Sequence, residues 1–134
     1  MTTQHATGTF LVNLVPLADD HATAAGLGRM SIDKQFHGDL EASSQGQMMS
    51  AMTGVKGSAG YVALERVTGT LAGRKGSFVL QHSGTMDRGT PTLSVSIVPD
   101  SGTDELTGLT GTLTIIIADG KHSYDFEYSI PESR

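Results

Sequence analysis

The sequence predicts an all-β fold, a single antiparallel eight-stranded barrel that takes in the whole chain, residues 1–134. Three observations predict it. Large apolar residues alternate with small or polar ones in run after run, which is typical of strands with one buried face. Turn signals, most of them containing glycine, separate these runs. The composition, with 37% hydrophobic and 17% charged residues, favours one folded core over a disordered chain or a coiled coil.

The alternation is clearest near the C-terminus, where His122, Tyr124, Phe126 and Tyr128 are separated by serine and acidic residues. The segment Leu113–Ile117 is apolar on both faces, so its outer side is expected to be covered. Short connections favour an up-and-down barrel, and eight strands enclose either a filled core or one small ligand. The expected strands are 8–15, 27–37, 39–52, 59–70, 74–86, 92–99, 111–118 and 121–130.

Turn signals account for the reversals between these strands. Asp119-Gly120 is the strongest two-residue hairpin signal, and Ala72-Gly73 joins two other expected strands in the same way. One short helical turn is expected at Ala18–Ala25, ended by Gly26. The methionines near the end of strand 39–52 have helical spacing, but the serines and glycines around them favour a strand.

Charge and composition exclude several classes of function. Nine basic and 14 acidic residues give a net charge of −5, so the chain lacks the clustered cations that bind nucleic acid or an anionic membrane surface. The absence of cysteine excludes disulfides, Cys–zinc sites and thiol catalysis. No signal peptide and no apolar run near ~20 residues is apparent, so we expect a cytoplasmic protein.

Five stretches taken in order carry a family resemblance: Phe36–Leu40, Gly57–Glu65, Gly73–Gly84, Val98–Gly111 and His122–Tyr128. Over about residues 6–130 they resemble a family of small, mostly bacterial proteins, family 3224 of the domains of unknown function. That family is similar in fold to the allene oxide cyclases and the dirigent proteins, which are calycin-like barrels. The fourth stretch looks like the glycine-rich loop that those barrels carry before a late strand. The resemblance implies a barrel with a lined cavity and an oligomer, and it implies no activity.

An acidic residue and a histidine are expected to meet inside the barrel. If Ala72-Gly73 forms the turn, facing residue numbers sum to 145, and Glu65 faces the inward Leu80. Glu65 and His82 are then inward diagonal neighbours, about 7–8 Å apart at Cα. A buried carboxylate needs a hydrogen bond or a cation, and His82 is the nearest candidate. A register slip of one residue would instead send both side chains to solvent.

This pair supports three hypotheses. In the first, the protein binds a small apolar molecule, with Glu65 and His82 as its polar anchor. In the second, it is an isomerase or cyclase in which Glu65 orients His82 as general acid or base. In the third, the pair is a satisfied structural contact inside a filled barrel, and the protein is a structural homo-oligomer.

Other side chains are candidate ligand contacts, although core packing is the more frequent role of such residues. The candidates are Tyr61, Tyr124, Tyr128, His122, Phe78 and Met48.

The remaining polar residues indicate no metal or cofactor. His82, His122 and Glu65 are suitable zinc ligands, but no HxH or HxxxH spacing supports a site. No phosphate loop, dinucleotide fingerprint or nucleophile elbow is present. His5, His21 and His37 are expected to be solvated, with His5 in an N-terminal tail.

An apolar outer face is also expected. Ile116, Val79, Val62 and Leu64 alternate with inward residues and should therefore point outward. An exposed apolar patch indicates a partner surface, and a homo-oligomer is the simplest partner. A covering segment of the same chain is the alternative.

Overall fold

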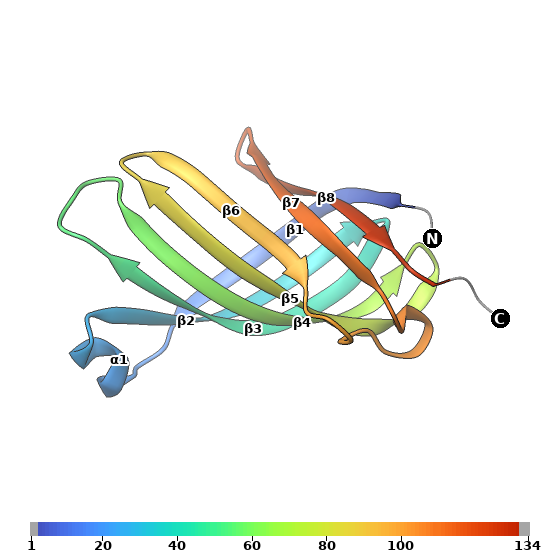
Figure 1. Cartoon of the computed structure of the whole chain (residues 1–134), viewed down its shortest axis with the longest axis horizontal. Coiled ribbons are helices and arrows are strands. Elements are labelled where there is room, and N and C mark those ends of the chain that lie inside the picture. The colour runs from blue at the N-terminus through green and yellow to red at the C-terminus, as the bar shows by residue number, and fades with distance from the viewer. Residues whose placement is uncertain (1–2, 132–134) are drawn as a thin grey trace.

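A computed structural model describes residues 3–131 and confirms the predicted fold, a closed antiparallel barrel in which each strand pairs with the next and β8 returns to β1 (Figure 1). The strands are β1 Gln4–Pro16, β2 Leu27–Gly38, β3 Leu40–Met52, β4 Ala59–Leu71, β5 Arg74–Asp87, β6 Thr90–Ile97, β7 Thr110–Ala118 and β8 Lys121–Ser129. A five-residue helix α1, Asp20–Ala24, precedes β2, and a 3-10 turn η1, Asp104–Leu106, precedes β7. Both of these helices, in the described part of the chain, are too short to span a bilayer.

Two-residue turns set the hairpins, as the sequence predicts. Ala72 and Gly73 have φ values of 49° and 84°, and Asp119 and Gly120 have values of 53° and 73°. Positive φ at both central residues is the turn geometry that matches the twist of paired strands. The β4–β5 register therefore follows the predicted sum of 145 along its whole length.

The N-terminal strand is longer than expected, and this corrects the placement of one histidine. β1 begins at Gln4 and pairs with β8, so His5 lies within a strand rather than in a tail. It is exposed, and its Nδ1 lies 2.9 Å from Asp125 Oδ1. His21 and His37 are exposed, as predicted.

One end of the barrel is packed with aromatic rings. Phe78 stacks on Phe126 at 5.7 Å between ring centroids, and Phe36 meets Tyr124 edge-on at the same distance. The glycine-rich segment before β7 closes this end, because it brings Leu106 and Leu109 into the core. Close packing here makes this half of the molecule a filled core.

The barrel closes weakly between β6 and β7. The only residue pair in this ladder is Ser96↔Thr112. Where β6 ends, the loop before β7 continues the sheet beside β5: Val98 N donates to Val79 O at 2.9 Å, and Thr103 N donates to Ser77 O at 2.9 Å.

The other end of the barrel is open. The β3–β4 and β5–β6 hairpins extend beyond the closed part, away from the two termini (Figure 1). The expected cover over the outer side of Leu113–Ile117 is absent from the described residues, since Ile116 is 46% exposed.

The apolar outer residues do not form one surface. Val62 and Leu64 are more than half exposed on β4, whereas Ile116 lies on β7, separated from β4 by β5 and β6. Val79 is half-buried beside the 98–101 segment. The single patch expected from the sequence is therefore wrong, because only Val62 and Leu64 of these four residues are exposed side by side, on β4.

Candidate functional site

Glu65 and His82 point into the barrel and meet there. The pairs Ala63↔His82 and Glu65↔Leu80 make the two residues diagonal neighbours on the inner face, as predicted. Both are almost completely buried, with 1% of Glu65 and 3% of His82 exposed. Their contact is direct, because His82 Nε2 lies 2.5 Å from Glu65 Oε2.

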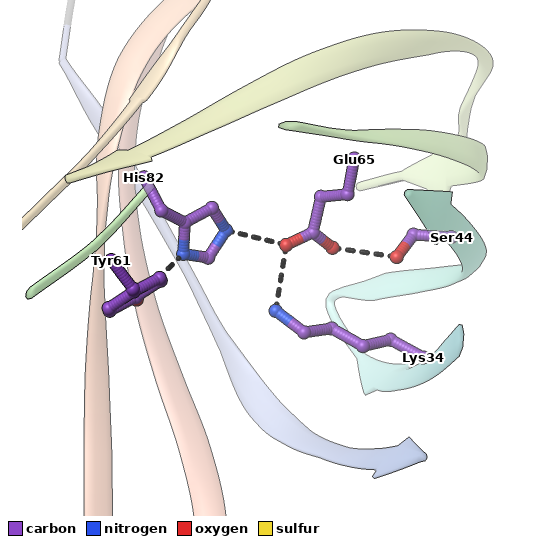
Figure 2. Close-up of polar contacts among 5 residues, drawn as sticks. All are labelled: Lys34, Ser44, Tyr61, Glu65 and His82. Atoms are coloured by element: carbon purple, nitrogen blue, oxygen red, sulfur yellow. Dashed lines mark hydrogen bonds and ion pairs between the residues drawn. The ribbon is translucent and has the colours of Figure 1, made fainter. Parts of the chain in front are cut away.

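The Glu65 carboxylate is the centre of a larger polar network (Figure 2). Lys34 Nζ donates to Oε2 at 2.8 Å, and Ser44 Oγ donates to Oε1 at 2.6 Å. Within residues 3–131, every buried side-chain nitrogen and oxygen has a hydrogen-bond partner. The buried charge is thus compensated by a cation and by hydrogen bonds on both oxygens.

Lys34 is the main residue that the sequence reasoning missed. It comes from β2, two strands away from Glu65, and its side chain crosses β3 at the small residues Ser44 and Gly46. Its amino group lies 5.0 Å from the centre of the Phe10 ring, which adds a cation–π contact. A signal for it was present, because position 34 falls in the same alternation as the inward Ile32 and Phe36 of that strand.

The environment keeps the Glu65 carboxylate ionised. Burial alone would raise its pKa, but the hydrogen bond from His82, the positive charge of Lys34 and the hydrogen bonds from Lys34 and Ser44 outweigh burial. Together they lower the pKa from 4.5 to about 2. An ionised carboxylate only accepts hydrogen bonds, so the hydrogen between the two groups belongs to His82 Nε2.

Tyr61 extends the network toward solvent. Its hydroxyl lies 3.3 Å from His82 Nδ1, and its ring centroid lies 6.1 Å from that of the imidazole. Burial, together with the negative charge of Glu65, raises the pKa of the Tyr61 phenol, which therefore keeps its proton. Across the strand pair, Gly84 provides room for the ring: a Cβ there would lie 2.6 Å from a Tyr61 ring carbon.

An apolar hollow of about 450 Å³ opens at the uncovered end of the barrel, on the inner face of β2–β6. Its size falls within the range of small-molecule sites, about 300–1,000 Å³. Neither Glu65 nor His82 lines it, so of the network only Tyr61 reaches its wall. Its main side chains are Met30, Met48, Met52, Met86, Leu93 and Tyr61.

The structure brings together some of the predicted ligand contacts and separates others. Met48 and Tyr61 line the hollow, whereas Phe78 and Tyr128 pack against Phe126 at the closed end. His122 lies against Phe10, with ring centroids 5.2 Å apart.

Tyr124 has a role inside the closed end. Its hydroxyl donates to His37 O at 3.0 Å and accepts from Leu40 N at 2.9 Å, which ties it to the β2–β3 connection. A contact between any of these residues and a ligand stays a prediction. In the described part of the chain, no three His, Asp or Glu side chains gather in a way that could hold a metal ion.

Comparisons with known proteins agree with this architecture. The family model described as "Protein of unknown function (DUF3224)" matches residues 6–128. The chain is also similar to a crystal structure, determined at 1.84 Å, of a DUF3224 protein with unknown function from Shewanella oneidensis MR-1. The two share 51% identity with a TM-score of 0.92, over 98% of this chain and 100% of that one. A comparison with curated proteins found no match.

Proposed function

We propose that this chain, which belongs to the DUF3224 family of proteins of unknown function, binds a small apolar molecule at the open end of its barrel. The observation that carries the proposal is the methionine-lined hollow of about 450 Å³, whose wall includes Tyr61. Methionine side chains are flexible and polarisable, so they adapt to apolar ligands of varied shape. The hollow favours a binding protein over a filled barrel with a purely structural role.

Glu65 and His82 contribute to this site indirectly, through their contact with Tyr61. They hold the Tyr61 hydroxyl through a hydrogen bond and lie outside the wall themselves. Only 4% of the His82 side chain is exposed, and both of its ring nitrogens contact protein groups. Because both ring nitrogens are engaged and the imidazole does not line the hollow, these contacts favour a binder over an enzyme that uses His82 as general base.

Two adjacent methionines provide a matched test, because Met48 points into the hollow and Met49 points out of the barrel. The neutral fluorophore N-phenyl-1-naphthylamine is expected to bind the wild type at one saturable site. Met48→Trp fills the hollow and should weaken binding at least tenfold, whereas Met49→Trp should leave it unchanged. Absence of saturable binding to the wild type, or equal loss in both variants, would show that the hollow is not the site.

A further inference from the structure

We propose that Tyr61 selects the ligand by its polar end: the molecule is an uncharged alcohol whose hydroxyl hydrogen is donated to the Tyr61 oxygen. This inference rests on the proposed function and names the class of ligand.

The network sets the direction of the Tyr61 hydrogen bond. The Glu65 carboxylate pairs with the Lys34 ammonium at 2.8 Å and also accepts the hydrogen on His82 Nε2. The tautomer that this contact selects carries its hydrogen on Nε2, toward Glu65, and has a lone pair on Nδ1. The Tyr61 hydroxyl must then donate to Nδ1. Its hydrogen is used within the protein, and only the oxygen lone pairs remain for a ligand.

The wall excludes charged ligands. Among the described residues that line the hollow, none is charged, and the Lys34 ammonium is held by Glu65. A carboxylate or an ammonium in this hollow would lose water without gaining a counter-charge. The other inward hydroxyl, Ser50, pairs with Tyr61 across the strands. It can rotate to donate or accept, so it does not distinguish donors from acceptors.

A series with one alkyl chain and different heads tests the inference: octane, 1-octanol, 1-methoxyoctane, octanoate and octylammonium. Binding is followed by NMR of ¹³C-methyl methionine in the wild-type protein. The methyl signals of Met30, Met48, Met52 and Met86 report on the hollow, and Met49 on the outer face is the internal control. We expect 1-octanol to bind about threefold to tenfold more tightly than 1-methoxyoctane, since one hydrogen bond separates them.

The variant Tyr61→Phe keeps the ring and removes the hydroxyl, so it should reduce the preference for the alcohol to near one while the ether binds as before. Equal binding of alcohol and ether to the wild type, or tighter binding of octanoate or octylammonium, would overturn the inference and leave the proposed function intact. If no member of the series moves the four inward methyl signals, both proposals are wrong.

Discussion

At the scale of single residues, the Glu65 carboxylate dominates the interior. An unpaired charge at this depth would cost several kcal/mol, and the three groups around it remove that cost. The same contacts that keep Glu65 ionised also orient His82 and, through it, Tyr61. A structural salt bridge and a binding group are therefore parts of one network.

Acid should break this network within a defined pH range. The pKa of Glu65 is about 2 in the folded protein, below its ordinary value of 4.5, so its ionisation stabilises the fold above pH 4.5. This stability is lost as the pH falls toward 2. The pKa difference corresponds to about 3 kcal/mol. Urea unfolding measured at intervals between pH 5 and pH 2 is expected to show a loss of this size.

The control for this prediction removes the charges in steps. Glu65→Gln should be destabilised at pH 7 by about 3–5 kcal/mol, because it leaves Lys34 buried without a counter-charge. The double variant Lys34→Met with Glu65→Gln should recover part of that stability and show a shallower acid dependence. If the double variant lost as much stability between pH 5 and pH 2 as the wild type does, the acid destabilisation would come from carboxylates other than Glu65.

Two buried tyrosines provide a second test at this scale. Tyr124→Phe leaves the Leu40 amide without its partner and should lower the free energy of unfolding by about 1–3 kcal/mol. Tyr128→Phe is the control, since its hydroxyl makes only a 3.4 Å contact with the exposed Gln4, and should cost well under 1 kcal/mol. Urea denaturation of the two variants checks the difference. Equal losses would mean that the ring rather than the hydroxyl matters at position 124.

At the scale of elements, close contact between β3 and β4 depends on a glycine. A Cβ at Gly46 would lie 2.0 Å from Leu64 O and 2.6 Å from Glu65 Cα. Both of these atoms belong to backbone, which cannot move aside as a side chain can. The small residue also lies where Lys34 crosses β3 to reach Glu65.

Gly46→Ala should accordingly force the two strands apart and cost about 1–3 kcal/mol. Gly28→Ala, on the inner face of β2, is the control, because the nearest atom to its Cβ would be the Ser50 hydroxyl at 3.2 Å. Thermal unfolding of both variants measures the contrast. A small effect at Gly46 would mean that β3 shifts easily relative to β4.

The β6–β7 junction is the weakest element contact of the barrel. One residue pair closes it, whereas β4 and β5 are paired from Ala59↔Met86 to Leu71↔Arg74. The uncovered edge of β6 carries Pro91, a residue typical of strand edges because it offers no N–H to a neighbouring chain.

Hydrogen exchange should reveal this difference. Amides of β6 that face the junction are expected to exchange through local opening, well before the amides shared by β4 and β5. Mass spectrometry of peptides from 90–97 and 59–71 measures both regions in one experiment. Equal protection of the two would mean that the barrel opens only by global unfolding.

At the scale of the whole molecule, we propose that a second copy covers the outer face of β2–β4. Leu27, Met49, Val62 and Leu64 are 37–54% exposed there, on neighbouring strands, and they line two adjoining outer hollows that share Met49 and Val62. An apolar surface of this kind can meet itself about a two-fold axis without opposing like charges.

Light scattering coupled to gel filtration is expected to give a homo-oligomer for the wild type. The double variant Val62→Lys with Leu64→Lys should shift it toward the monomer, since lysines would have to be buried on both sides of the interface. Ile116→Lys, on the opposite part of the barrel, is the control and should keep the wild-type mass. A monomeric wild type would contradict this proposal.

The sequence by itself determined the local order of the chain: eight strands, the two-residue hairpins and the register of β4 against β5. Period-two alternation and turn residues act over a few positions, and a two-residue turn leaves its flanking strands a single pairing, so Glu65 and His82 could be placed together in advance. Contacts between strands that are not consecutive depend on how the sheet closes and on how far a side chain reaches. Only the tertiary structure therefore decided that Lys34 completes the network and that Tyr124 and Phe78 belong to the packed end. It also decided that the open end keeps an apolar hollow that Glu65 and His82 do not line.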